Sequence, residues 1–538
     1  METRITSLFS AVKIVLYSCS LFLVQVSKAQ GWNNLYQSAT YEHQLRSPVI
    51  CRNLSEDGLV SAVFELQNTQ PIQSCINLIE TDFNGSILNQ TRISLQSTYR
   101  GPNLLRMELM KIQPWPQENA YLILGAAHQN GNPEVAGSFL LMVDASLSTA
   151  LKQELFPMPL VLFWDMDITP ISNRVVLSGM KHDSIAPINT NRQAFIQVLD
   201  SGLNPISAYE YAPTALPVGS MQNRFDNFKA VDISVSETNE YINVAGNISR
   251  LNSGNYVPAA ISGRFLMNTV GTLTPLWFRS LVNTPIDQFV VSDLKTDEVN
   301  NITVITGCLS PTIGINEATF WTLDNAGNGI TYGQFEANPP PNHELRPYQI
   351  EKLGNGHFKV AGWSYDSVPS TPPQINKYNF FEISYNPVLN LFYNLRVYPG
   401  LTDGLPTMYG TGMLGVNTQW SYYNGPNKVY IVSYHCPRFF TTWWDGEAQQ
   451  TAFAWQNKKN LLPPPINPLW QQLRIVSTTG SGTLCDIWQV GSACDGQEPG
   501  YLVLPSPIAV NPYLTASLYF DGVLPVDYFQ QPCDNAHD

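Results

Sequence analysis

Two carboxylates stand close together in an apolar stretch, and this pair is the first candidate for chemistry. Asp165 and Asp167 are separated by Met166 and follow Trp164. If the segment is a β-strand, both side chains point to one face, because side chains alternate along a strand. Two carboxylates on one face are able to act as the acid and the base of a glycosidase. The plainer interpretation is a solvated strand edge.

An aromatic group near the C-terminal end is the second candidate. Trp443, Trp444 and Asp445 close an aromatic segment that begins at residue 439. Exposed tryptophans stack on the apolar face of sugar rings, and a carboxylate accepts hydrogen bonds from sugar hydroxyls. The competing interpretation is that these aromatics fill the space between the last and first repeats of the fold. The sequence leaves both interpretations open.

No established catalytic or metal-binding motif accompanies these candidates. The chain lacks the GxSxG, HExxH and P-loop patterns, and the GxGxxG match at residues 410–415 precedes no expected helix. The histidines are scattered singly, and no two cysteines have the CxxC spacing of a zinc site. We therefore expect no motif-based catalytic residue, no metal and no cofactor.

The cysteines predict two cross-links. Eight cysteines are present, and seven remain if a leader peptide is removed before Gln30. We expect Cys485 to bond to Cys494 across a hairpin, and Cys51 to bond to Cys75, which would tie the entry strand to the first repeat. The odd number leaves at least one thiol that stays reduced or pairs with another chain.

The first 29 residues have the pattern of a secretory signal peptide. Arg4 and Lys13 precede an apolar stretch over residues 14–26, and small residues stand three and one positions before Gln30. This stretch is too short to span a bilayer, and no later one reaches about 18 apolar residues. We expect a secreted or cell-surface protein, extracellular or periplasmic, with no transmembrane segment.

The charge balance excludes one class of partner. Without residues 1–29 the chain holds 26 basic and 41 acidic residues, a net charge of −15. So acidic a protein is not expected to bind nucleic acid, whose recognition needs a basic surface. At 13% charged and 44% hydrophobic residues, the composition is that of a folded globular protein.

One pattern recurs about seven times, at intervals of roughly 55–70 residues. A short apolar run ends at a small residue, usually glycine, and after a polar insert a second run of alternating apolar residues ends in an Asx/Gly turn. About 60 residues accommodate four short strands and their turns, which is one propeller blade. The clearest copies span residues 121–144, 175–200, 241–268, 302–328 and 358–384, and weaker copies span residues 62–82 and 429–455.

These repeats predict an all-β fold, an about seven-bladed β-propeller with six to eight blades allowed. We expect the glycine to lie on an inner strand, where neighbouring blades crowd toward the central channel and a Cβ would be in the way. We expect the Asx/Gly segments, including residues 324–328, to be hairpin turns rather than metal loops. The chain divides into a signal peptide (1–29), a propeller (30–476) and a C-terminal disulfide-containing segment (477–538), which either closes the ring or forms an appendage.

The repeat resembles that of secreted β-propeller proteins common in Bacteroidota, most closely in residues 175–200 and 302–328. The resemblance covers most of the region outside the two ends of the chain, and it implies a fold and a location rather than an activity. The C-terminal sorting domain of that family is not evident in this sequence.

Propellers host enzymes, binding modules and scaffolds, so the fold does not decide the function. The leading hypothesis is a non-catalytic secreted module that binds a protein or a glycan. The competing class is a carbohydrate-active enzyme with Asp165 or Asp167 at the channel mouth. A third hypothesis is a subunit of an extracellular assembly, joined through the odd cysteine or the C-terminal segment.

Overall fold

A computed structural model describes the chain between Trp32 and Pro532, apart from segments between strands. For β1 and for β25 to β33 it describes the backbone only. The residues outside the description are 1–31, 39–42, 68–72, 83–85, 98–104, 130–131, 156–160, 183–191, 212–225, 253–254, 282–287, 313–314, 338–342, 354–355, 368–375, 399–419, 423–428, 432–439, 446–449, 460–469, 479–491, 497–517, 525–527 and 533–538.

Within the described residues, the strands form seven antiparallel sheets of four or five strands, numbered here as blades 1 to 7, and one two-stranded sheet. Blade 1 holds β2 (His43–Arg52), β3 (Gly58–Gln67), β4 (Gln73–Asp82), β5 (Ile87–Ser97) and β32 (Leu518–Leu524). Blade 2 holds β6 (Leu105–Trp115), β7 (Ala120–Gln129), β8 (Asn132–Asp144) and β9 (Ala150–Leu155), with the short helix η1 (Pro116–Glu118) between β6 and β7. Blade 3 holds β10 (Val161–Ile168), β11 (Val175–His182), β12 (Arg192–Leu199) and β13 (Pro205–Glu210). Blade 4 holds β14 (Asn227–Ser236), β15 (Asn239–Asn252), β16 (Asn255–Met267) and β17 (Leu273–Leu281).

The remaining sheets lie in the second half of the chain. Blade 5 holds β18 (Gln288–Asp297), β19 (Ile302–Thr312), β20 (Ile315–Leu323), β21 (Gly329–Ala337) and β31 (Ser492–Gly496). Blade 6 holds β22 (His343–Lys352), β23 (Phe358–Ser367), β24 (Asn376–Asn386) and β25 (Leu391–Tyr398). Blade 7 holds β28 (Phe440–Asp445), β29 (Gln450–Lys459), β30 (Trp470–Thr478), β1 (Trp32–Ser38) and β33 (Tyr528–Pro532). The two-stranded sheet holds β26 (Trp420–Tyr422) and β27 (Val429–Ile431).

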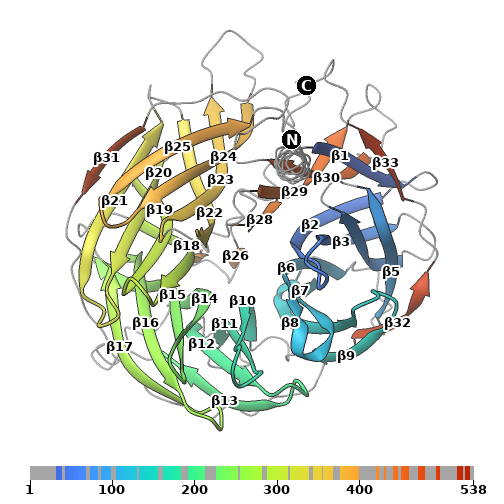
Figure 1. Ribbon diagram of the computed structural model, residues 1–538, viewed down its shortest axis with the longest axis horizontal. Coiled ribbons are helices and arrows are strands. Elements are labelled where there is room, and N and C mark those ends of the chain that lie inside the picture. Colours follow the sequence, from blue (N-terminus) through green and yellow to red (C-terminus); the bar gives the residue numbers. More distant parts are fainter. Residues whose placement is uncertain are drawn as a thin grey trace, which may run out of the picture.

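The blades stand around a common axis, with the first strand of each nearest to it (Figure 1). Around the ring, β2 contacts β6, and the contacts continue through β10, β14, β18, β22 and β28 back to β2. The expected all-β propeller with about seven blades is confirmed. The weaker copy at residues 429–455 was wrong in part, because residues 429–431 pair with β26 rather than with blade 7.

The two ends of the chain meet in blade 7. Strand β1 pairs antiparallel with β30 on one side and with β33 on the other, so the N-terminal strand completes a sheet that begins with C-terminal strands. The other strands of the C-terminal segment pair with the outermost strands of distant blades, β31 with β21 and β32 with β5. The described parts of this segment therefore extend along the outer edges of three blades.

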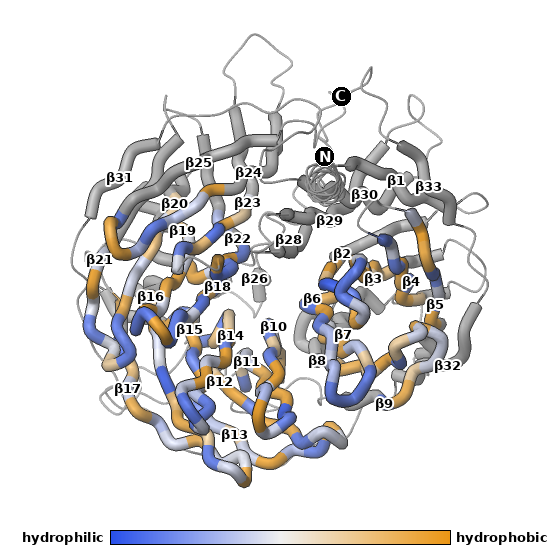
Figure 2. The backbone as a smooth tube through the Cα atoms, viewed as in Figure 1, coloured by the Kyte–Doolittle hydropathy of each residue, from blue (hydrophilic) through white to orange (hydrophobic). Residues whose placement is uncertain are grey.

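Apolar side chains fill the spaces between neighbouring blades. Figure 2 shows hydrophobic and hydrophilic residues mixed along the strands, as expected when strands alternate between faces. Separate buried clusters lie between blades 1 and 2, 2 and 3, 3 and 4, 4 and 5, and 5 and 6. Each described sheet between blades 2 and 5 is thus covered on both faces.

The repeated glycines lie on the second strand of blades 2 to 6, which is an inner strand, as expected. In blades 2 to 6 the glycine pairs with the first-strand residue that precedes a β-bulge. The bulge moves the first-strand backbone toward its neighbour and removes the room for a Cβ. From blade 2 to blade 6, these glycines are Gly125, Gly179, Gly246, Gly307 and Gly362.

Replacing one of these glycines by alanine is expected to destabilise the protein. A Cβ on Gly246 would lie 1.8 Å from the carbonyl oxygen of Asn227, which is backbone and cannot rotate away. Overpacking of this kind costs about 1–3 kcal/mol and sometimes more. We expect Gly246→Ala to lower the unfolding midpoint in urea. The control is Gly202→Ala, where the Cβ would meet the mobile end of the Asn204 side chain, and equal midpoints for the two variants would contradict this account.

The Asx/Gly segments are hairpin turns between the third and fourth strands. In three of them the backbone N–H of the residue four positions on donates to the Asx side chain, to Asp200 at 2.7 Å, to Asn268 at 2.8 Å and to Asp324 at 2.7 Å. Asp324 also accepts from the side chain of Asn328 at 2.8 Å. The side-chain oxygens of these Asp and Asn residues accept hydrogen bonds within their own turns, which supports the turn interpretation over a metal loop.

The expected disulfide between Cys51 and Cys75 was wrong, because both residues are buried thiols. Cys51 lies on β2 and Cys75 on β4, with β3 between them. Strands two apart are separated by about 9–10 Å, beyond the roughly 7 Å that a disulfide spans between Cα atoms. Cys485, of the other expected pair, lies outside the described residues, so its bond to Cys494 stays a prediction.

No helix among the described residues is long and apolar enough to cross a membrane.

Candidate functional site

A cavity of about 240 Å³ lies at the axis of the ring, where the first strands of blades 1 to 6 converge. Its charged lining residues are four bases and four acids. They are Arg52, Lys111, Lys229 and Lys295, and Asp165, Asp167, Asp293 and Glu351. Gln113, Ser292 and Gln349 add polar groups, and the other lining residues are largely aliphatic.

On three of the first strands, residues that follow the bulge line this cavity. The residue directly after the bulge is Lys111 on β6, Asp165 on β10 and Asp293 on β18. Two residues further on, the same face of these strands carries Gln113, Asp167 and Lys295, as strand alternation requires. The repeated bulge therefore arranges polar side chains in two tiers around the axis.

Asp165 is a structural carboxylate that joins three blades. It is only 5% exposed, and its Oδ1 accepts from Lys111 Nζ of blade 2 at 2.9 Å. Its Oδ2 accepts from the backbone N–H of Val231 on blade 4 at 3.0 Å. Because β14 has no neighbouring strand on its inner edge, this N–H would otherwise lack a protein partner. Both oxygens of Asp165 are thus occupied.

Asp167, two residues further along β10, has the same arrangement of partners. Its Oδ1 accepts from Gln113 Nε2 at 2.7 Å, and its Oδ2 accepts from the backbone N–H of Ile233 at 3.0 Å. The two carboxylates share a face, as the sequence predicted, but neither stands on a solvated edge. Each is fixed by donors from the two flanking blades, and this occupancy argues against a water-activating acid and base pair.

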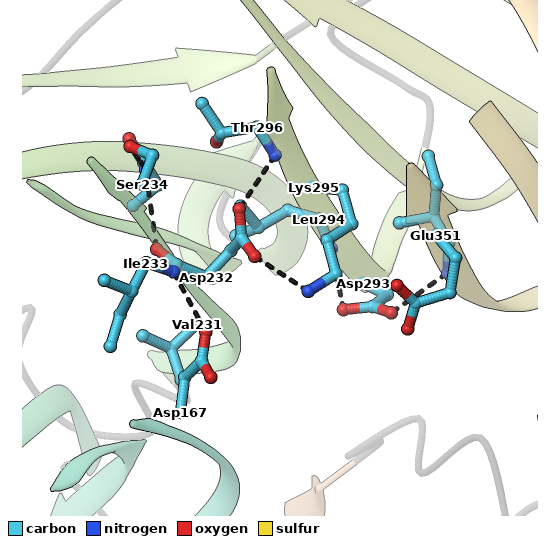
Figure 3. A network of polar contacts seen from close by, with 12 residues as sticks. Asp167, Val231, Asp232, Ile233, Ser234, Asp293, Leu294, Lys295, Thr296 and Glu351 are labelled. Carbon is cyan, nitrogen blue, oxygen red and sulfur yellow. Dashed lines mark hydrogen bonds and ion pairs between the residues drawn. The ribbon is translucent and has the colours of Figure 1, made fainter. Parts of the chain in front are cut away.

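The same device joins blades 4, 5 and 6 (Figure 3). Asp232 accepts from the backbone N–H of Thr296 and from Lys295 Nζ, both at 2.8 Å. Asp293 accepts from the backbone N–H of Ile350 at 3.0 Å. In each case a first-strand carboxylate binds the exposed inner edge of the next blade. Hydrogen bonds from first-strand side chains therefore connect blades 2 to 6 in succession around the axis.

The cavity shifts the protonation of several groups. Burial and the nearby Asp165 carboxylate raise the pKa of Asp293 to about 7, against the opposing effect of Lys295 and Lys111. Burial lowers the pKa of Lys295, but Asp232 and Glu351 outweigh it and hold that pKa well above its ordinary value. The two lysines are therefore charged at neutral pH, whereas Asp293 is partly protonated.

The sequence pattern points to Asp165 and Asp167 but not to the other charged residues of the cavity. Lys111, Asp293 and Lys295 come from blades that are distant in sequence. The signal that could have found them is the bulge position, since each lies at or near the first residue after a bulge. No group of three or more metal-ligating side chains occurs among the residues for which side chains are described.

The aromatic candidate lies on the blade between the two ends of this lining, since β28 contacts β22 and β2. Trp443, Trp444 and Asp445 belong to β28, the first strand of blade 7, where Trp443 pairs with Ala452 and Trp444 with Thr451. Their side chains lie outside the described part of the chain. The glycan-binding and gap-filling interpretations of this group both stay predictions.

Comparison with known proteins assigns no function to this chain. No protein-family model matches the chain, and no curated protein matches its sequence. An α-L-arabinofuranosidase from Fusarium graminearum, solved with an iminosugar inhibitor, has 10% identity, covers 64% of this chain and 95% of its own, and has a TM-score of 0.38. Drosophila semaphorin 2a has 7% identity, covers 82% of this chain and 75% of its own, and has a TM-score of 0.35.

The WD40 domain of SCAP from fission yeast has 9% identity, covers 85% of this chain and 96% of its own, and has a TM-score of 0.28. All three TM-scores are below 0.5, so these similarities carry no argument about this chain. These identities transfer no activity, ligand or partner from one protein to another.

Proposed function

We propose that this protein is a non-catalytic propeller module that binds a glycan or a protein outside the cytoplasm. The secreted location rests on the signal-like pattern of residues 1–29, and the kinship with secreted Bacteroidota propellers rests on the repeat. Both are part of the proposal. The acidic composition argues against nucleic acid as the partner.

The observation that carries the non-catalytic proposal is the occupancy of the channel carboxylates. Asp165 and Asp167 each bind backbone N–H groups of blade 4 with one oxygen and a side chain of blade 2 with the other. A general acid or base must exchange its proton with substrate or water. Carboxylates that hold the blades together are poorly suited to proton transfer, which argues against a carbohydrate-active enzyme that uses them.

The aromatic segment of β28 is the proposed contact with a glycan. Adjacent tryptophans provide stacking area for a sugar ring, and Asp445 provides a hydrogen-bond acceptor. Polar and aromatic groups of this kind are what distinguish a sugar site from an ordinary loop or edge strand.

The test is a polysaccharide panel with residues 30–538, in which retained protein and released reducing sugar are measured together. We expect retention without sugar release, and at least a tenfold loss of retention in Trp443→Ala/Trp444→Ala. The control is Val388→Ala/Leu389→Ala, two adjacent aliphatic residues that are 72% and 68% exposed in the turn before β25.

The outcomes separate the competing functions. Sugar release that persists in the presence of a chelator would overturn the non-catalytic proposal and would favour an enzyme that uses the channel carboxylates. An absence of retention on every polysaccharide would overturn the glycan partner and leave a protein partner as the remaining form of the proposal.

A further inference from the structure

The central cavity has the size of a small-molecule site. Its volume of about 240 Å³ lies below the range of about 300–1,000 Å³ that drug-sized ligands occupy. It exceeds the roughly 10–15 Å³ that a single buried water requires, so it has room for more than the single waters that satisfy buried polar groups. A ligand for this cavity therefore has the size of an amino acid or a monosaccharide.

The lining favours a charged ligand. Bases and acids are equal in number among the described lining residues. The cavity presents charges of both signs around one axis, which complements a ligand that itself carries both charges.

The ammonium groups of Lys111 and Lys295 have N–H donors available to a ligand. An ammonium group has three N–H donors. Lys111 donates to Asp165, and Lys295 donates to Asp232. These are the side-chain acceptors described for the two ammonium groups, so each has donors left for the carboxylate of a ligand.

One lining carboxylate has capacity for a further donor. Glu351 accepts from Gln349 Nε2 at 3.2 Å, a long contact for a carboxylate that has room for further donors.

We propose that the central cavity binds a small zwitterion, a compact molecule of the free amino acid class. Its ammonium group donates to Glu351, and its carboxylate accepts from Lys111 and Lys295. Each end of the ligand thus meets groups of opposite charge, and the net charge of the cavity is unchanged on binding. The inference concerns the channel formed by blades 1 to 6, whereas the proposed glycan contact is β28, the first strand of blade 7, which contacts β2 and β22 of that channel.

The state of Asp293 agrees with this assignment. Burial and the neighbouring Asp165 raise the pKa of Asp293 to about 7, which reflects negative charge that the two lysines only partly offset. An ammonium group bound beside it would favour the ionised carboxylate. Binding of the zwitterion is therefore expected to release protons when it is measured near pH 7.

The test is isothermal titration calorimetry on the full chain at pH 7.5, with glycine, L-serine and β-alanine as zwitterions. Methylammonium and acetate carry the two charges separately and serve as matched probes. We expect the best zwitterion to bind at least tenfold more tightly than either single-charge probe. Equal affinities for the zwitterion and a single-charge probe, or no heat from any zwitterion at 10 mM, would overturn the assignment.

A variant places the ligand in this cavity. Glu351→Gln removes the charge that faces the ammonium group, and we expect at least a tenfold loss of affinity with an unchanged melting temperature. Glu237→Gln is the control, since Glu237 is exposed on the turn between β14 and β15. If Glu351→Gln fails to fold, Glu351→Asp replaces it. Aspartate keeps the negative charge, but its shorter side chain holds the carboxylate farther from the ligand, and we expect at least a threefold loss of affinity. Wild-type affinity in whichever variant folds would overturn the assignment to this cavity.

Discussion

Replacing Asp165 by alanine is expected to lower the free energy of unfolding by about 1–4 kcal/mol, because a buried backbone donor loses its acceptor and an ion pair with Lys111, whose side chain is 28% exposed, is lost. The variant leaves the ammonium group of Lys111 without its carboxylate and the backbone N–H of Val231 without its acceptor. An unsatisfied buried donor by itself costs about 1–3 kcal/mol. Both losses fall on the axis, where three blades meet.

Urea unfolding followed by tryptophan fluorescence measures this effect as a shift of the midpoint at constant slope. Asp200→Ala is the matched control, because Asp200 also accepts a backbone N–H, at 2.7 Å from Asn204, but within its own surface turn. That control is expected to cost about 0.5–1.5 kcal/mol, as for an ordinary hydrogen bond. Equal costs for the two variants would show that Asp165 does not join the blades.

A second variant separates the ion pair from the backbone contact. Lys111→Met in the Asp165→Ala background removes the stranded charge, so the double variant is expected to be more stable than the sum of the single effects predicts. Asp165→Asn retains an acceptor for Val231 while losing the charge, and an intermediate cost is expected. Strict additivity of the two single variants would mean that Lys111 and Asp165 do not interact.

The fold was predictable because the repeat is a property of single blades. Each copy carries two runs of alternating residues and an Asx/Gly turn, and these depend on local strand and turn geometry. The innermost strand of each blade was less visible. Its bulge inserts one residue, as between Leu109 and Lys111, and this shifts the alternation by which a strand is recognised.

The central network could not be predicted in full, because it joins residues one repeat apart. Asp165 and Val231 are 66 residues apart, and Asp293 and Ile350 are 57 apart, so no local pattern connects them. Only an alignment of the first strands would place them side by side. The Cys51 and Cys75 prediction failed for a related reason, since nearness in sequence does not distinguish adjacent strands from strands two apart.

The stability of the wild-type protein is expected to fall as the pH rises from about 4 to about 7, and Asp293 is expected to account for much of that change. Its pKa is about 7 in the folded protein and about 4 in the unfolded chain. Between these values the folded state binds more protons than the unfolded state, so the free energy of unfolding decreases with pH. A difference of about three units corresponds to about 4 kcal/mol as an upper bound.

The groups that face Asp293 come from every neighbouring first strand. Lys111 of β6 and Lys295 of β18 favour its charged form, and Asp165 of β10 opposes it. Glu351 of β22 and Asp167 of β10 line the same cavity. Burial also raises the pKa of Asp232 despite the pairing with Lys295, so Asp232 contributes in the same direction.

The variant Asp293→Asn tests this directly, because it stays neutral at all pH values and keeps an oxygen that accepts from Ile350. We expect its stability relative to wild type to improve by about 1–4 kcal/mol between pH 4.5 and pH 8, measured by urea unfolding at each pH. Asp144→Asn is the control. Although burial opposes it, hydrogen bonds from Ser146 and Thr149 lower the pKa of Asp144, so that contribution is lost only as the pH falls below about 4. Its difference from wild type is therefore expected to be constant from pH 5 to pH 8, and the same constancy in Asp293→Asn would mean that Asp293 is ionised throughout this range.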